Sequence, residues 1–352
     1  MDEQFLPDLL QLRGSVVAAS DEFFAAKENL ITPGAPTFVP HTFDVKGQIY
    51  DGWETRRRRG PGGALPDRSV RDWVIVRLGA PGVIRAVVVD TAFFTGNYPQ
   101  GCSADACSLT GYPSAEEVAD GPGLGPDGWQ EIVPRILLTG DARHSFTVSS
   151  GRRFTHVRLN IFPDGGVARL RVHGEVVPDP ALLEGITVDL AALGNGGDIV
   201  ACSDQFYSSP RNAISPGLSR AMGEGWETRR RRDPGHEWLV VRLSGRGVID
   251  LAEIDTSRYR GNQPEAASLQ FMDVRDEVTS DELAADSGWH DLLPRTRLLP
   301  DTPHRFRVHG APATHLRLNI FPDGGVARLR LYGSLTEDGL AAVRRRWDET
   351  CS

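Results

Sequence analysis

The sequence RLNIFPDGGVARLR occupies residues 158–171 and returns without a change at residues 317–330. Around its first half, Val157, Leu159 and Ile161 alternate with Arg, Asn and Phe side chains. Such alternation is typical of a strand with one buried face. The PDGG that follows is typical of a turn, and VARLRVHG resumes an extended pattern. We therefore predict a β-hairpin in each copy.

Five other blocks recur in the same order, once before residues 158–171 and once between these and residues 317–330. They are residues 8–31 with 189–214, 52–59 with 225–232, 72–84 with 237–249, 90–99 with 255–264, and 128–135 with 288–295. The spacing falls from 183 (Ser20 to Ser203) to 159 (Asn160 to Asn319), a difference of 24 residues that collect in loops of the first copy. A unit of roughly 160 residues is too long for a solenoid repeat. We predict two similar domains, 1–178 and 179–335, and a C-terminal tail, 336–352.

The remaining sequence is rich in short β-branched runs punctuated by Gly and Pro, such as WVIVRL and its counterpart WLVVRL. Helical patterns are few: a turn around DEFFAAKEN, the short EEVAD and the terminal LAAVRRRWDE. Many short strands with such turns are typical of sandwiches and jelly rolls. We predict an all-β protein of two tandem antiparallel β-sandwich domains.

The composition excludes several classes of partner. A net charge of −8 argues against a general nucleic-acid-binding protein. No apolar run approaches the ~20 residues of a membrane span, and the acidic start MDEQFLPDLL is unlike a signal peptide. The four cysteines show neither CxxC spacing nor a disulfide-dense pattern. We expect a cytoplasmic protein with no nucleic-acid or membrane partner.

The identical GWETRRRR segments at residues 52–59 and 225–232 predict an anion site. Guanidinium groups offer forked donors that suit a carboxylate or a phosphate. In an extended chain, Trp53 and Thr55 face one way and Glu54 the other, so the four arginines cannot all face one ligand. We expect at least one or two of them to pair with acids. A surface strand with an internal Glu–Arg pair is the alternative.

A second polar constellation, Asp90-Thr91 with Gly96-Asn97, follows a strand and recurs in the second copy. It supplies an acid, a hydroxyl and an amide at one strand end. An Asx-type turn is the alternative, and for Gly-Asn alone it is the favoured interpretation. Asp164 lies within PDGG, which turn chemistry alone can explain. Asn160, Arg169 and Arg171 share the predicted hairpin, so their polar ends could reach the same cleft.

Histidines recur in register at His144 and His304, and at His156 and His315. Each could be a general acid, although a buried, hydrogen-bonded role is the more common one for such residues. No HxH, HExxH or His/Cys cluster points to a metal. We expect no cofactor, and assistance by a divalent ion is left open.

Taken together, GWETRRRR, DTAFFTGNYP and RLNIFPDGGVARLR, each repeated in one order, resemble the allantoicase (allantoate amidinohydrolase) family over roughly residues 9–333. The resemblance implies two β-sandwich repeats akin to galactose-binding-like jelly rolls, and a homo-oligomer. It also implies hydrolysis of a linear amidine C–N bond, converting allantoate to ureidoglycolate and urea in allantoin and purine degradation. The second copy differs by having Arg258 and Arg260 in place of Phe93 and Thr95, and Glu224 in place of Asp51.

Allantoate carries one carboxylate and two ureido arms, so its site needs a cationic fork and acceptors for many N–H groups. The predicted catalytic residues are Glu54 or Asp90 as the base and His156 as an aid to urea departure. The predicted substrate-binding residues are Arg56, Arg57, Arg58, Thr91, Asn97, Asn160 and Asp164. The counterparts in the second copy are Glu227, Arg229, Arg230, Asp255, Asn262, Asn319 and Asp323. Direct displacement and an imine-like intermediate both fit, and a non-catalytic jelly roll that binds a small ligand or carbohydrate is the competing function.

Overall fold

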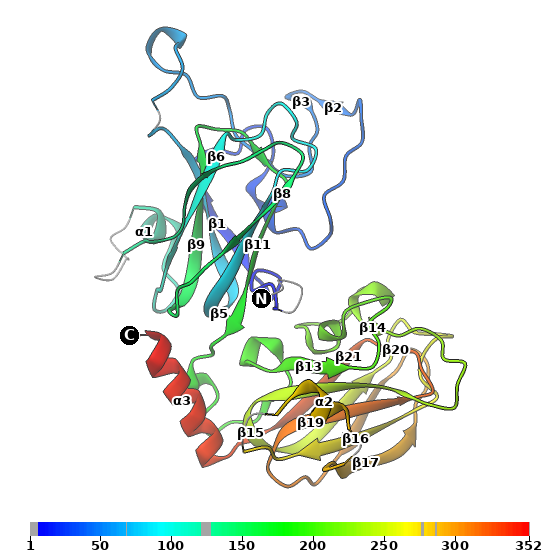
Figure 1. Cartoon of the computed structure of the whole chain (residues 1–352). Coiled ribbons are helices and arrows are strands. Elements are labelled where there is room, and N and C mark those ends of the chain that lie inside the picture. The colour runs from blue at the N-terminus through cyan, green and yellow to red at the C-terminus, as the bar shows by residue number, and fades with distance from the viewer. Residues whose placement is uncertain (1–5, 68, 121–127, 276–277, 286, 352) are drawn as a thin grey trace. The chain divides into compact units, whose positions relative to one another are not determined.

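The computed structural model describes residues 6–67, 69–120, 128–275, 278–285 and 287–351. The chain forms two compact units, one of Met1–Val176 together with Thr350–Ser352 and one of Val177–Glu349. Each unit is built mainly from antiparallel strands and holds one copy of the repeated sequence (Figure 1). The prediction of two similar β-sandwiches is confirmed. Below, the two units are called the first and second repeat.

The strands of the first repeat are β1 (Ser15–Ala19), β2 (Phe43–Asp44), β3 (Gly47–Gln48), β4 (Trp53–Glu54), β5 (Asp72–Asp90), β6 (Gly101–Cys107), β7 (Gln130–Leu137), β8 (Arg143–Thr147), β9 (Arg153–Phe162), β10 (Gly166–Val167) and β11 (Arg169–Val176). Its short helices are η2 (Lys27–Ile31), η3 (Pro61–Gly63) and α1 (Ala115–Asp120).

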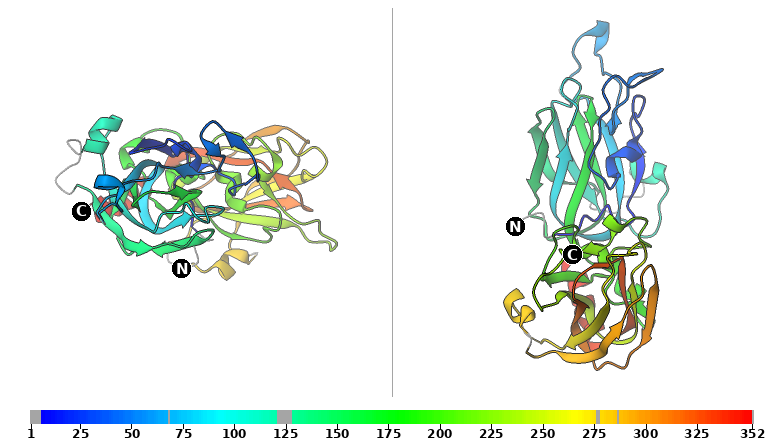
Figure 2. Two further views of the ribbon diagram at one scale, coloured as in Figure 1. Left: turned by 90° about the horizontal axis from the view of Figure 1, so that it is seen from above. Right: turned by 90° about the vertical axis from the view of Figure 1, so that its right-hand side faces the viewer.

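The long strand β5 is the spine of this repeat. Its first half pairs with β1 on one side and with β9 on the other. β9 pairs in turn with β6, and β6 pairs with β7. The second half of β5 pairs with β8 and β11 instead. The strand therefore belongs to both layers of the sandwich (Figure 2). Its apolar side chains, among them Val74, Val76, Ile84 and Val87, are fully buried and form the core.

The second repeat follows the same plan, with β15 as its spine. Its strands are β12 (Val188–Asp189), β13 (Asp198–Cys202), β14 (Trp226–Glu227), β15 (Glu237–Asp255), β16 (Ala266–Met272), β17 (His290–Arg297), β18 (Pro303–Arg307), β19 (Ala313–Phe321), β20 (Gly325–Val326) and β21 (Arg328–Leu335). Its helices are η4 (Pro180–Leu182), η5 (Leu193–Asn195), η6 (Pro210–Ile214), η7 (Met222–Glu224), α2 (Ser280–Ala284) and α3 (Glu337–Cys351).

The segment predicted as a tail, 336–352, supplies α3. Thr336 caps it, because its hydroxyl accepts a hydrogen bond from the Gly339 N–H at 3.2 Å. The three helical patterns expected from the sequence correspond to η2, α1 and α3. None of the described helices is long and apolar enough to cross a membrane.

The predicted hairpin at residues 158–171 is wrong. β9 ends at Phe162, a cis peptide bond joins Phe162 to Pro163, and the PDGG segment then carries the chain into the other layer. β10 pairs with β4, and β11 pairs with β5 rather than with β9. The second repeat does the same. Alternation identified the strands, but a strand's neighbour is chosen by packing of the whole sheet.

Candidate active site

Strand β4 is anchored by Trp53. Its side chain is fully buried, and the indole N–H donates to the backbone oxygen of Asp21 at 2.7 Å. Because side chains alternate along an extended chain, Thr55 is buried as well, while Glu54 between them turns the other way and is partly exposed. The repeated GWET sequence thus fixes where Glu54 lies.

Three repeated segments meet at Glu54. In the β4–β10 pair, Glu54 lies opposite Gly166 of the PDGG segment. Thr55 fastens the same segment, since its hydroxyl accepts the Gly165 N–H at 3.1 Å. The backbone oxygen of Asn97 accepts the Gly166 N–H at 2.8 Å. Segments that are about 40 to 110 residues apart in sequence therefore form one polar corner.

Glu54 and Asn97 are joined through their side chains. The Asn97 Nδ2 donates to Glu54 Oε1 at 2.7 Å. Burial raises the pKa of Glu54 above its usual value, while the Asn97 hydrogen bond and the positive charge of Arg57 limit the rise. A carboxylate that is desolvated and oriented in this way is a good general base.

Asp164 of the PDGG turn holds the arginine run in place. Its buried carboxylate accepts the Arg58 backbone N–H at 2.7 Å and lies 3.5 Å from the Arg57 Nη1. Burial raises the pKa of Asp164, against the opposing effects of the Arg58 N–H and the Arg57 charge. We call Glu54, Arg57, Asn97 and Asp164 the Glu54 cluster.

Two other arginines of the run, Arg56 and Arg58, are engaged with acids. Arg56 Nε donates to Asp21 Oδ1 at 3.1 Å, and its guanidinium lies over the Phe23 ring at 5.3 Å. Arg58 Nε donates to the buried Asp72 at 3.1 Å. Arg56 and Arg58, both predicted to bind substrate, thus form pairs within the protein, as the alternation argument expected for part of the run. Arg57 remains the best-placed cation for a ligand.

Asp90 and Thr91 support the fold instead of joining this corner. Asp90 Oδ1 accepts the Ala92 N–H at 2.8 Å, which is the Asx turn considered as the alternative. The Thr91 hydroxyl is fully buried and donates to the Thr139 carbonyl at 2.8 Å. Within the described residues, no hydrogen bond or ion pair joins either side chain to Glu54.

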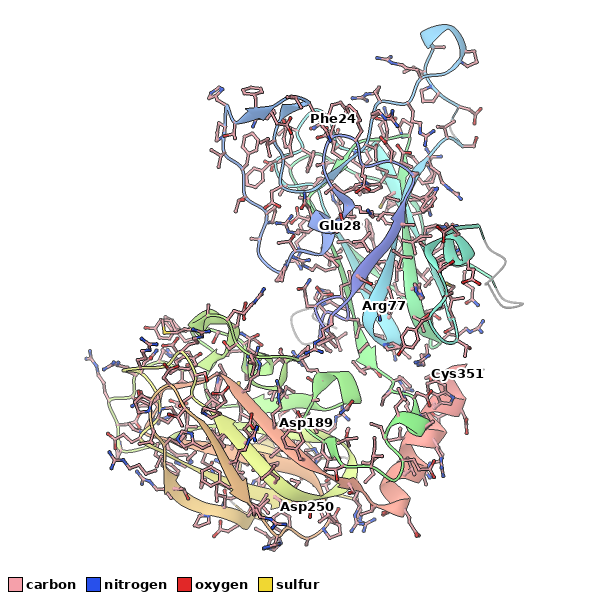
Figure 3. The ribbon with its side chains drawn as sticks, turned by 180° about the vertical axis from the view of Figure 1, so that it is seen from behind. Phe24, Glu28, Arg77, Asp189, Asp250 and Cys351 are labelled. Carbon is pink, nitrogen blue, oxygen red and sulfur yellow. The ribbon has the colours of Figure 1, made fainter. Side chains whose placement is uncertain are left out.

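His156 is far from the Glu54 cluster. It lies opposite Arg77 in the β5–β9 pair, whereas the Phe24 N–H binds the Glu54 carbonyl. Figure 3 shows Phe24 and Arg77 at opposite ends of the first repeat. Burial lowers the pKa of His156 to about 4, so the ring is neutral near pH 7. The structure therefore gives His156 no part in urea departure from this corner.

Asn160 lies on β9, beside the neighbouring strand β6 of the same sheet. Its Nδ2 donates to Ser103 Oγ at 3.1 Å and to Asp105 Oδ2 at 2.9 Å. The same carboxylate oxygen accepts from Arg158 Nη2 at 2.8 Å. These bonds make Asn160 part of a buried polar group within the sheet.

Sequence reasoning missed an aromatic stack next to the Glu54 cluster. Rings of Phe93 and Phe38 lie 5.6 Å apart, Phe38 and Tyr50 5.3 Å, and Tyr50 and Phe94 4.8 Å. Phe94 rests on Gly166, where any Cβ would collide with its ring. The repeated DTAFFTGNYP block contains Phe93 and Phe94, but Phe38 and Tyr50 lie in a loop that is shorter in the second copy.

The second repeat builds a similar corner, the Glu227 cluster of Glu227, Arg230, Asn262 and Asp323. Asn262 Nδ2 donates to Glu227 Oε1 at 2.6 Å, and the Arg231 N–H donates to Asp323 Oδ2 at 2.8 Å. Arg230 forms no ion pair with any acid that the structure describes.

The remaining predicted residues of the second repeat also find partners inside it. Arg229 Nε donates to Asp204 Oδ1 at 2.8 Å. Asp255 Oδ1 accepts the Ser257 N–H at 2.7 Å, and Asn319 Oδ1 lies 3.1 Å from the His236 ring nitrogen. These three residues lie outside the Glu227 cluster as their counterparts lie outside the first.

A metal site would need several ligands in one place. Among the residues that the structure describes, no three His, Cys, Asp or Glu side chains gather in that way. Each cluster presents carboxylate, amide and guanidinium groups.

Comparison with known proteins agrees with the repeated architecture. A family model described as the allantoicase repeat matches residues 8–177 and again 188–336. A probable allantoicase of Nocardia farcinica is 51% identical over 334 residues, covering 94% of each chain. One of Streptomyces avermitilis is 50% identical over 344 residues, 96% of this chain and 88% of that protein. The crystal structure of allantoicase from Saccharomyces cerevisiae superposes with a TM-score of 0.74 at 33% identity, covering 93% of this chain and 92% of that one. The chain belongs to the allantoicase family.

Proposed function

We propose that this protein is an allantoicase that hydrolyses allantoate to ureidoglycolate and urea. The observation that supports this most directly is the Glu54 cluster, in which Asn97 orients a desolvated carboxylate beside a guanidinium that is held by Asp164. Allantoate presents a carboxylate and ureido N–H groups on one carbon. The cluster offers each of these groups a complementary partner.

In the proposed complex, Arg57 binds the substrate carboxylate. Its side chain is 57% exposed, so it can meet a ligand, while Asp164 restrains it from behind. The aromatic stack lies beside the backbone that carries Glu54 and lowers the exposure of the corner to water. Lower water content strengthens both the ion pair with the substrate and the basicity of Glu54.

Ionised Glu54 starts the reaction. In direct displacement, it takes a proton from water as the water oxygen bonds to the central carbon. The C–N bond breaks, its electron pair leaves with nitrogen, and that nitrogen receives a proton as urea departs. In the alternative, Glu54 removes an N–H proton from the retained ureido arm and passes it to the departing nitrogen as urea leaves. Water then adds across the C=N bond of the imine-like intermediate, which restores the N–H and gives the C–OH of ureidoglycolate. General acid–base catalysis of either kind contributes about 10²–10⁴-fold.

We assign the chemistry mainly to the first repeat. Only there does an ion pair within 4.0 Å restrain the second position of the arginine run, Arg57, among the residues that the structure describes. The first repeat also carries the aromatic stack, whereas the loop of the second repeat is shorter and Arg258 stands where the first has Phe93. The Glu227 cluster has the same hydrogen bond but lacks both of these features.

The test is release of urea when purified protein is mixed with allantoate. We expect one urea and one ureidoglycolate for each allantoate consumed. The competing function, a jelly roll that binds a small ligand without turnover, predicts binding of allantoate with no urea above the uncatalysed rate.

Replacing Asn97 with alanine is expected to move the acidic limb of the kcat/KM profile to higher pH. The Asn97 hydrogen bond lowers the pKa of Glu54, so its removal lets that pKa rise, and more base is needed to ionise the carboxyl. The shift should be about one to two pH units, because a bond to a charged group is worth about 1.5–3 kcal/mol and one unit is about 1.4 kcal/mol. Asn262→Ala is the matched control, and an equal shift there would refute the assignment to the first repeat.

The cellular context is also proposed. We place the protein in the cytoplasm, acting on its small-molecule substrate as a homo-oligomer, without a cofactor and without nucleic-acid or membrane partners. Urea release measured after exhaustive chelation would reveal a requirement for a divalent ion.

A further inference from the structure

The second repeat contains a cavity outside the Glu227 cluster as defined above. Its volume is about 480 Å³. It is lined by residues of the loop before β16, of the edge strand β17 and of the turn that follows, among them Gln263, Glu265, Arg295, Arg297, Leu298 and Pro300. We call it the β17 pocket.

Two arginines give this pocket its charge. Arg295 and Arg297 both belong to β17, and both line the cavity. Arg295 stacks over the Phe321 ring at 4.2 Å, which holds its guanidinium without consuming its N–H donors. Both side chains are exposed, and neither forms an ion pair with any residue that the structure describes. Two such cations beside a cavity suit a carboxylate.

Acceptors lie in the same pocket. Gln263 Oε1 is buried and has no hydrogen-bond partner among the described residues. Glu265 adds an exposed carboxylate, and it is too far from both arginines to form an ion pair. An unpaired buried acceptor is costly unless a ligand or water satisfies it. A ligand for this pocket therefore carries N–H donors as well as an anionic group.

The first repeat shares only one of these features: Arg135, the counterpart of Arg295, stacks over the Phe162 ring at 4.0 Å. At the positions that correspond to Arg297 and Gln263 stand Leu137 and Tyr98. The Tyr98 ring lies against Gly140, where an added Cβ would be 2.6 Å from the ring. Leu137 is 80% exposed and carries no charge. Duplication alone does not explain the pocket, because it arises from substitutions specific to the second repeat.

We propose that the β17 pocket is an accessory binding site for a small ureido carboxylate, the chemical class of allantoate and ureidoglycolate. Arg295 and Arg297 bind the carboxylate, and Gln263 and Glu265 accept the ureido N–H groups. The choice of ureido ligand rests on the proposed function, whereas the preference for a carboxylate with N–H donors follows from the pocket itself.

The test uses N-carbamoylglycine, which has one carboxylate and one ureido group, and isothermal titration of the full chain. The background protein carries Arg57→Gln and Arg230→Gln, which remove the cations of the Glu54 and Glu227 clusters. We expect it to bind one N-carbamoylglycine per chain and to bind the neutral N-carbamoylglycinamide at least about tenfold more weakly, a difference of about 1.4 kcal/mol.

Adding Arg295→Gln and Arg297→Gln should weaken binding of N-carbamoylglycine at least about tenfold. The control adds Arg242→Gln and Arg307→Gln, which remove two exposed charges of the same repeat outside the pocket, and should change affinity less than about twofold. No binding to the background protein, or equal weakening in the control, would overturn the proposal. Thermal unfolding verifies that each variant is folded. Urea release by the unmodified chain reports the proposed function separately, so either idea can fail alone.

Discussion

Replacing Glu54 with glutamine is expected to lower kcat for allantoate by about 10²–10⁴-fold. Glutamine keeps the shape of the side chain and can still accept the Asn97 hydrogen bond, but it cannot take a proton from water. The buried carboxylate also loses its desolvation cost, so the folded protein should be at least as stable as before. Initial rates of urea release, with circular dichroism to verify folding, measure the effect.

Glu227→Gln is the matched control, because Asn262 holds Glu227 through the same bond at 2.6 Å. We expect kcat to change by less than about threefold if the first repeat does the chemistry. A loss as large as that of Glu54→Gln would show that turnover requires Glu227 as well as Glu54. A full-rate Glu54→Gln enzyme would remove Glu54 from the mechanism.

Replacing Arg169 with methionine is expected to destabilise the first repeat by about 3–5 kcal/mol, the usual cost of removing one partner of a buried ion pair. The Arg169 side chain is 2% exposed. Its guanidinium donates to Asp51 Oδ2 at 2.7 Å, to the Asp51 carbonyl at 3.0 Å and to the Gly34 carbonyl at 3.1 Å. Methionine fills part of the volume but removes the Arg169 donor from each of these acceptors.

Urea denaturation followed by tryptophan fluorescence checks this, with the transition of the first repeat moving to lower urea. Arg71→Met is the control, because Arg71 is exposed and forms no ion pair with a described residue, so a change within about 0.5 kcal/mol is expected. A comparably small effect of Arg169→Met would mean that the loop of residues 32–51 is held without it. Arg169 thus supports this loop, whereas the sequence suggested that it could face a cleft.

Much of the fold followed from the sequence because its signals are local. Duplicated blocks gave two domains, and alternation identified strands such as β9 and β19. The partner of each strand did not follow, because alternation says which face is buried and not which strand lies beside it. For that reason the predicted hairpin is instead a crossing between layers.

The candidate site was predicted in part. Glu54, Arg57, Asn97 and Asp164 were all named from sequence, and the structure brings them together. Thr91 and His156 carry equally suitable functional groups, but burial and register assign them to the core and to the far end of the repeat. Chemistry alone cannot distinguish these cases.

The GWETRRRR segment shows which features the sequence determines and which ones depend on the tertiary structure. From its sequence alone, GWETRRRR determined that Trp53 is buried, that Glu54 faces the other way and that part of the run pairs with acids. Only the tertiary structure decided that Asp21 and Asp72 engage Arg56 and Arg58 while Asp164 restrains Arg57. The reason is physical: side-chain direction depends on neighbours in the chain, whereas ion pairs join residues that only folding of the whole sandwich brings within reach.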